Sequence, residues 1–408
     1  MALASEIKKS LDIPVIVGGV HISTLPSCLG DFDLGVIGEG EETMLELMRI
    51  FERHNRFPKE ELIKTDGIVF KEDDGRLNIT KRRELIESLD SIPFPDRSFL
   101  NKKHFEPKWR PILQEKTGHM DILTSRGCPY RCVFCSTSLF WQRYRFRSPE
   151  NVCEEIKQVV DNYKIRNITF GDDLFTVDKE RLKKIAALIE QNGLNEKATF
   201  GCMSRANLFD DELCQILKRM NVKYLNFGFE SGSERVLKFL KTGNVTVEDN
   251  NRAVMLCKKY GFRTTGSFII GNPYETIEDM KQTIELMKTM KKLNEDIDIW
   301  TYVMTPFPGT EIWEIAKKRG KVSDDMKDWG EINIWSSEYP MLLDDTIDRN
   351  EFKKTFAEAR AVSDSIKVGN KWIKNRIRYY PLQTIKSVLT NPRRTAGLLR
   401  QIAVSKIK

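Results

Sequence analysis

Regular alternation of strand and helix signals between residues 121 and 320 limits the folds open to this chain. Short apolar segments at 121–125, 167–171, 198–202, 224–229, 264–271 and 297–304 are separated by stretches with helical periodicity. This alternation is typical of α/β folds with a parallel sheet. Six units in roughly 200 residues predict a partial (β/α)6 barrel of TIM-like form, which places chemistry in the loops after the strands.

Three cysteines follow the first of these strands. Cys128, Cys132 and Cys135 are spaced C-x3-C-x2-C. Thiolates are ligands of iron–sulfur clusters, and three of them leave one iron of a four-iron cluster open to a small molecule. The alternatives are three buried thiols or a zinc knuckle. Zinc sites favour paired cysteines with a fourth ligand nearby, and no histidine closely follows this segment.

This cysteine motif, with Phe134 before its last cysteine, resembles that of the radical S-adenosylmethionine (SAM) superfamily, and the resemblance spans roughly residues 115–320. It implies a [4Fe–4S] cluster on Cys128, Cys132 and Cys135, with SAM bound at the open iron. One-electron reduction then yields a 5′-deoxyadenosyl radical, which is chemistry that the cofactor supplies. A one-electron reductant such as flavodoxin or ferredoxin and a small-molecule or lipid substrate are the partners expected.

The resemblance extends to polar residues and a glycine after later strands. An acidic pair follows the second strand, where the superfamily contacts the SAM ammonium, and a serine–arginine pair follows the third, where it contacts the carboxylate. A glutamate ends the fourth strand, and an isoleucine and a glycine lie at the end of the fifth, where the superfamily approaches the adenine of SAM. Either acid of the pair could instead cap a helix. With Phe134, the implied SAM-binding residues are Asp172, Asp173, Ser204, Arg205, Glu230, Ile269 and Gly271.

Residues 1–54 also alternate strand and helix, which predicts part of a doubly wound, Rossmann-like sheet. The segments Val17-Gly-Gly-Val-His21 and Gly38-Glu-Gly-Glu41 resemble the C-terminal half of the cobalamin-binding domain that precedes many radical SAM enzymes. The D-x-H-x-x-G half, which supplies the axial histidine, is missing, so we expect a truncated domain or a remnant that no longer holds cobalamin. The implied cobalamin residues are Gly18, Gly19, His21, Gly38 and Gly40, without an axial role for His21.

The expected domains are the cobalamin-domain part (1–54), a connector (55–120), the barrel (121–320) and a helical region with a basic tail (321–408). The whole chain carries a net charge of +7, and residues 365–408 contain eleven Lys or Arg without Asp or Glu, so residues 1–364 carry −4. Basic, aromatic and apolar residues together favour binding to an anionic membrane surface; nucleic acid or a plain solvated helix are the alternatives. Without a signal peptide or an 18-residue apolar run, we expect a cytoplasmic protein, peripheral at the membrane.

The sequence therefore predicts a radical SAM enzyme for cobalamin-linked methylation, or another C–H transformation, of a lipid, tetrapyrrole or natural product. A tRNA methylthiotransferase is one alternative. That class requires three more cluster cysteines in an N-terminal domain, and residues 1–120 contain only Cys28. A non-catalytic protein that binds a cluster or a partner is the other alternative.

Overall fold

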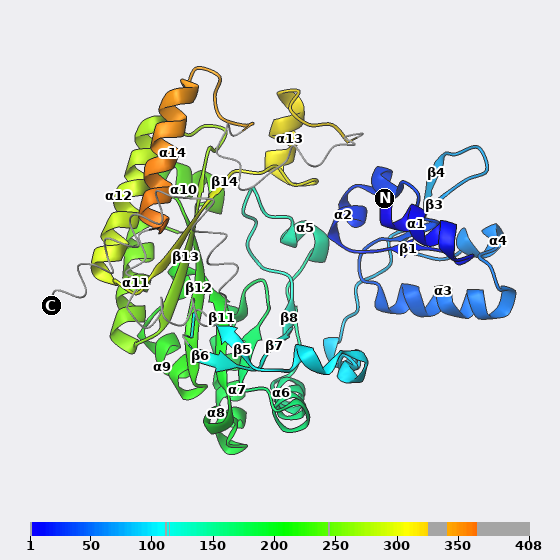
Figure 1. The fold of residues 1–408 in the computed structure, drawn as a ribbon, viewed down its shortest axis with the longest axis horizontal. Coiled ribbons are helices and arrows are strands. Elements are labelled where there is room, and N and C mark those ends of the chain that lie inside the picture. Colours follow the sequence, from blue (N-terminus) through cyan, green and yellow to red (C-terminus); the bar gives the residue numbers. More distant parts are fainter. Residues whose placement is uncertain (1, 111, 114, 244, 325–340, 365–408) are drawn as a thin grey trace.

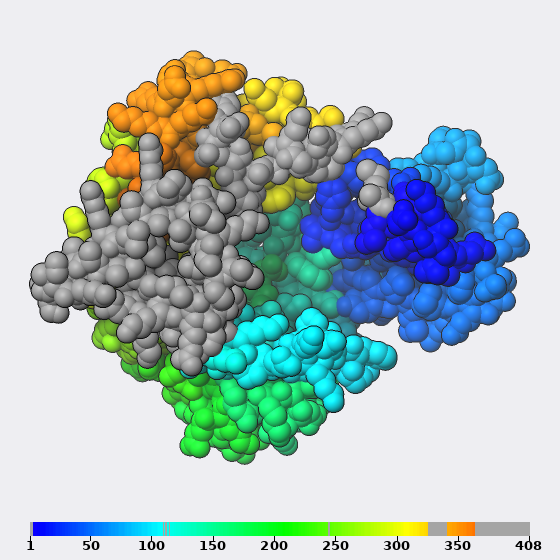
Figure 2. Space-filling model, in the orientation of Figure 1, coloured from blue at the N-terminus to red at the C-terminus, as the bar shows by residue number. Residues whose placement is uncertain are grey.

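The computed structural model describes residues 2–110, 112–113, 115–243, 245–324 and 341–364. They form a β/α barrel part and a smaller N-terminal lobe, residues 2–80, which stands at one side of the barrel (Figures 1 and 2). The predicted basic tail lies outside the described residues. Within the described ranges, no helix is both long and apolar enough to cross a bilayer.

Six parallel strands form the barrel sheet, in the order β14-β13-β12-β11-β10-β7, and confirm the predicted fold class. Alternate residues of β13 are buried, as expected for strands with helices on one face and the barrel interior on the other. The strands are β7 (His119–Ile122), β10 (Asn167–Phe170), β11 (Thr199–Ser204), β12 (Val222–Glu230), β13 (Arg263–Ile270) and β14 (Asp298–Val303).

Except for α13 (Glu311–Lys318), which stands apart from the strands, the helices of the barrel cover the outer face of this sheet (Figure 1). Most begin at a Ser, Thr or Asp whose side chain accepts a hydrogen bond from a backbone N–H in the first turn, and Thr246 and Thr276 form full capping boxes. The helices are α6 (Pro149–Tyr163), α7 (Lys179–Gln191), α8 (Leu194–Lys197), α9 (Asp211–Arg219), α10 (Glu234–Lys241), α11 (Val247–Tyr260), α12 (Ile277–Leu293), α13 (Glu311–Lys318) and α14 (Arg349–Asp364). The last, α14, packs on α12, where Lys288 contacts Glu358.

The N-terminal lobe contains a four-stranded sheet in the order β1-β2-β3-β4. Strands β1 (Ile16–Val17) and β2 (Leu34–Val36) are parallel, and β3 (Ile68–Lys71) and β4 (Leu77–Ile79) form an antiparallel hairpin. The sheet thus passes the boundary expected at residue 54, because β3 pairs with the otherwise open edge of β2. Its helices are α1 (Ala2–Ser10), α2 (Val20–Thr24), α3 (Glu41–His54) and α4 (Lys59–Leu62).

Along the chain, two further strand pairs come between β4 of the lobe and the first long barrel helix, α6. Strands β5 (Lys108–Arg110) and β6 (Glu115–Thr117) form an antiparallel pair just before the barrel. Strands β8 (Ser125–Arg126) and β9 (Arg145–Phe146) form a second pair, and residues 127–144 between them are called the cysteine loop below. This loop contains the short helix α5 (Thr137–Trp141) and leaves the barrel just after β7.

Candidate functional site

The cysteine loop is fixed at its neck and at its middle. At the neck, Gly127 has φ +85°, and a Cβ there would lie 2.5 Å from the Arg143 carbonyl oxygen, so only glycine fits. In the middle, the Val133 N–H donates to the Leu240 carbonyl (3.1 Å), and the Val133 carbonyl accepts from the Ile312 N–H (3.2 Å). The end of α10 and the start of α13 therefore hold the loop above the barrel.

The chemistry of the donor set fits an iron–sulfur cluster. The pKa of Cys128 is raised to about 11, chiefly by burial, and the neighbouring Cys132 and Cys135 contribute to this rise because like charges repel. Bound iron would relieve this repulsion, since thiolates are its ligands. Among the described residues, no three His, Cys, Asp or Glu side chains are arranged as a ready metal site, so the fit rests on donor type and proximity.

Arg205 lies beside the cysteine loop, as its place after the third strand predicted. Its Nη1 contacts the Cys132 Sγ at 3.4 Å, and its guanidinium lies 3.9 Å from the centre of the Tyr130 ring. Its Nη2 donates to the Lys241 carbonyl oxygen at 3.3 Å. A fixed, buried cation therefore stands next to the cysteines and is positioned to meet an anionic group of a ligand there.

Glu230 ends β12 in an uncommon backbone conformation. It has φ 62°, which side-chain-bearing residues rarely adopt, and it sits at a register shift between β12 and β13. Its Oε1 accepts from the Lys241 Nζ at 3.0 Å, and both side chains are buried. Removing one partner of a buried pair leaves an uncompensated charge. Backbone strain beside a buried ion pair is typical of functional sites.

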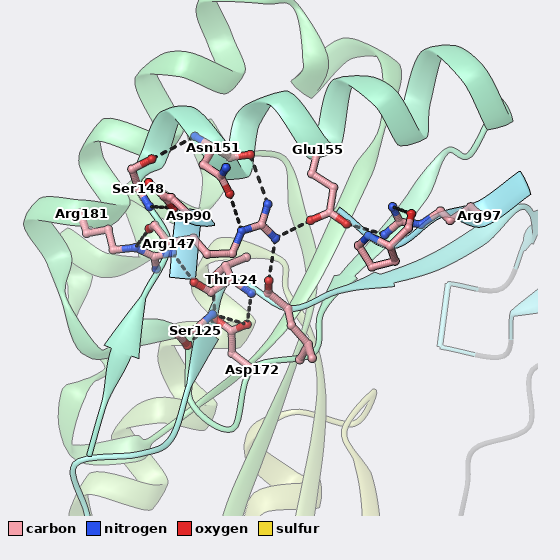
Figure 3. A network of polar contacts seen from close by, with 12 residues as sticks. Asp90, Arg97, Thr124, Ser125, Arg147, Ser148, Asn151, Glu155, Asp172 and Arg181 are labelled. Atoms are coloured by element: carbon pink, nitrogen blue, oxygen red, sulfur yellow. Dashed lines mark hydrogen bonds and ion pairs between the residues drawn. The ribbon is translucent and has the colours of Figure 1, made fainter. Parts of the chain in front are cut away.

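The two adjacent acids after β10 have different surroundings. Asp172 is buried and accepts from the backbone N–H and the hydroxyl of both Thr124 and Ser125 (Figure 3). Burial raises the pKa of Asp172, although these four bonds and Arg181 favour the charged form. Asp173 is exposed and accepts from the Thr137 hydroxyl of the cysteine loop at 3.0 Å. Asp172 therefore fixes the strand that leads to the cysteines, and Asp173 faces the loop itself.

The remaining candidates divide between the site and its support. Phe134 and Ile269 pack against one hydrophobic cluster, so the cysteine loop and the end of β13 meet there. Ser204 is buried, and its hydroxyl forms a hydrogen bond with the Thr176 hydroxyl at 2.9 Å, so it belongs to the residues that support the site. Gly271 has φ +87°, and its N–H donates to Glu275 at 2.6 Å. The Glu275 carboxyl is fully buried, which raises its pKa to about 7.

A cavity of about 360 Å³ lies at the carboxyl ends of β1 and β2. Four predicted cobalamin residues, Gly18, Gly19, Gly38 and Gly40, line it; His21, an exposed residue of α2, does not. Arg126 and Trp141 complete the lining from the barrel side. We call this space the glycine cavity. Where these glycines form the wall, no side chain projects into the cavity, so a ligand can approach the backbone closely there.

Sequence reasoning missed several residues that connect these parts. Glu39 belongs to the Gly38–Glu41 segment, and nothing near it in the sequence indicates its partners Arg126 and Arg145, which are 87 and 106 residues away. Lys241 is the last residue of an ordinary amphipathic helix. Its position opposite a buried glutamate depends on the fold alone.

Residues 122–287 match the Radical SAM superfamily. The chain carries a radical SAM domain. It is 36% identical over 310 residues to an uncharacterized methyltransferase of Pyrococcus horikoshii, and the aligned residues cover 74% of this chain and 62% of that protein. It is 25% identical over 359 residues to the anaerobic magnesium-protoporphyrin IX monomethyl ester cyclase of Rubrivivax gelatinosus, covering 86% and 60%. The chain thus spans about 60% of the length of these curated relatives.

Solved structures share the fold of the lobe together with the radical SAM domain. The cobalamin-dependent SAM radical enzyme OxsB, solved with aqua-cobalamin and SAM, matches with a TM-score of 0.69 at 18% identity, covering 99% of this chain and 60% of that one. The radical SAM methyltransferase TsrM from Kitasatospora setae, solved with cobalamin and a [4Fe–4S] cluster, matches with a TM-score of 0.65 at 20% identity, covering 88% and 74%. At these identities the likeness shows the fold.

Proposed function

We propose that this chain is a radical SAM enzyme with a corrinoid in the glycine cavity, acting in methylation or another C–H transformation. The observation that carries the proposal is the position of the cysteine loop. Its middle is held over the barrel by Leu240 and Ile312, and its Trp141, with Arg126 of β8, lines the glycine cavity. A ligand at the cysteines and a ligand in the cavity would therefore lie on either side of one short segment.

In the proposed enzyme, Cys128, Cys132 and Cys135 hold the cluster, and a one-electron reductant such as flavodoxin or ferredoxin serves as partner. When bound, the cluster and SAM supply reductive cleavage to a 5′-deoxyadenosyl radical, and the corrinoid supplies methyl transfer. Arg205 binds the SAM carboxylate and Asp173 binds its ammonium, because each offers an opposite charge beside the loop. Glu230 and Lys241 hold polar groups of the ligand at the end of β12.

A cleft of about 880 Å³ supports an apolar substrate of the lipid, tetrapyrrole or natural-product type. Its volume lies in the usual range for small-molecule sites. It runs from α3 and the proline-rich connector to the end of β7 and reaches Ser125 and Arg126 beside the cysteine loop. The three arginines that line it are already paired with carboxylates. Its apolar lining includes Leu45, Ile86, Leu89, Ile92, Phe94 and Leu123.

Anaerobic reconstitution tests the proposed function. Wild-type protein should take up close to four irons per chain and form 5′-deoxyadenosine from SAM under dithionite. Cys132→Ala should lose the cluster's visible absorbance and all SAM cleavage, since a cluster iron loses its ligand. Cys28→Ala, a cysteine of the N-terminal lobe, is the matched control and should retain both. Formation of 5′-deoxyadenosine by a folded Cys132→Ala variant, judged by circular dichroism, would overturn the assignment.

A further inference from the structure

Glu39 lies where the N-terminal lobe meets the neck of the cysteine loop. It follows β2 between two glycines of the glycine cavity, and it is only 8% exposed. Its carboxylate accepts from Arg126 Nη1 at 2.5 Å, from both terminal nitrogens of Arg145 at 2.9 and 3.0 Å, and from the Ile86 N–H at 2.8 Å. Both carboxylate oxygens are therefore bound by groups from outside the lobe.

The two arginines form the neck of the cysteine loop. Arg126 is the register partner of Arg145 in the β8–β9 pair, so two positive charges stand directly opposite each other. Like charges at opposite positions of a strand pair are destabilising. Glu39 lies between them and balances this repulsion. Burial alone would raise the pKa of Glu39, but hydrogen bonds from Arg145 and Arg126 outweigh it and lower the pKa, so the carboxylate is charged at neutral pH.

Arg126 links the neck to the cavity and to the cysteines. It lines the glycine cavity, its second terminal nitrogen contacts Glu41, and its guanidinium lies 5.2 Å from the centre of the Trp141 ring, which lines the same cavity. Arg126 is two residues before Cys128 in the chain. A ligand that fills the cavity touches the same side chains that set the shape of the loop neck.

We propose that Glu39 is a positioning residue that couples a ligand in the glycine cavity to the cluster-binding shape of the cysteine loop. The inference rests on the proposed function, because it takes the ligand to be a corrinoid. Glu39 holds Arg126 and Arg145 together, and this closed neck is the form that binds both cofactors. Binding at the two sites is then reciprocal: the cluster raises affinity for the corrinoid, and the corrinoid stabilises the cluster.

Titration of hydroxocobalamin into apoprotein and into cluster-reconstituted protein tests the coupling. Wild-type protein should bind hydroxocobalamin about fivefold or more tightly when it holds the cluster, the lower end of usual coupling. In Glu39→Gln, which keeps the shape and removes the charge, the two dissociation constants should become equal. The control is Glu87→Gln, because Glu87 pairs with Arg143 of the same loop at an exposed position away from the cavity; it should keep the wild-type ratio.

Cluster lifetime gives a readout that does not depend on turnover. Hydroxocobalamin should slow the loss of cluster absorbance to a chelator in wild type and in Glu87→Gln, and not in Glu39→Gln. The conservative variant Glu39→Asp should restore part of the effect if Glu39→Gln folds poorly. The coupling alone would be refuted if Glu39→Gln kept the wild-type affinity ratio. It would also be refuted if wild type bound both cofactors but bound hydroxocobalamin equally well with and without the cluster. Failure of wild type to bind hydroxocobalamin at all would refute the proposed corrinoid function and the coupling with it.

Discussion

Asp172 and Asp173 are adjacent in the chain, and replacing each by asparagine should separate support of the site from contact with the ligand. Asp172 accepts four hydrogen bonds from buried groups of Thr124 and Ser125. Bonds to a charged acceptor contribute about 1.5–3 kcal/mol each, and neutral ones about 0.5–1.5. In Asp172→Asn the two N–H donors keep an oxygen acceptor, while the two hydroxyls must turn to accept from the new amide.

Changing four charged bonds to neutral ones costs about 1–1.5 kcal/mol each, or about 4–6 kcal/mol together. Because the neutral amide avoids the cost of burying a charge, which raises the pKa of Asp172, we expect a net destabilisation of about 2–4 kcal/mol. This corresponds to a fall in Tm of roughly 5–10 °C. Asp173→Asn should change Tm little, because Asp173 is exposed, and it should weaken SAM binding about tenfold or more by removing a carboxylate opposite the ammonium. Thermal unfolding by circular dichroism and equilibrium dialysis with labelled SAM measure the two effects. A stable Asp172→Asn variant together with an Asp173→Asn variant of normal SAM affinity would contradict the assignment.

Two further predictions concern the buried carboxyl after β13 and the apolar cleft. Because burial raises the pKa of Glu275 from 4.5 to about 7, the folded protein keeps a proton that the unfolded chain loses, and stability falls as pH rises between these values. Between pH 5 and pH 8 the free energy of unfolding, measured with urea, should fall by about 3 kcal/mol less in Glu275→Gln than in wild type. The same fall in both proteins would contradict the buried, protonated state of Glu275. Leu123→Asp should weaken binding of the neutral probe N-phenyl-1-naphthylamine about tenfold, whereas Leu11→Asp, at an equally exposed leucine outside the cleft, should not; equal losses would place the probe elsewhere.

The barrel could be predicted from the sequence because its signals are local. Strands of buried apolar residues, helices with capping residues at their starts and the cysteine spacing are all visible within windows of about twenty residues. Apolar periodicity was less informative in α3. Leu45 and Met48 share one side of that helix and are exposed, while Leu47 packs with residues of the lobe strands and Ile50 is also buried. Which side of a short helix is buried depends on the neighbouring strands, and these come from residues 68–79.

The sequence by itself determined the fold class and the position of the cysteines, since ligand spacing and strand–helix alternation do not require distant contacts. It left open which acid of the pair supports the loop and which faces it. Only the tertiary structure decided this, because the donors that bind Asp172 lie 47 and 48 residues before it. The same is true of Glu39, whose arginine partners belong to the other part of the molecule. Buried charges are paired through space, so their partners follow from packing rather than from the order of residues.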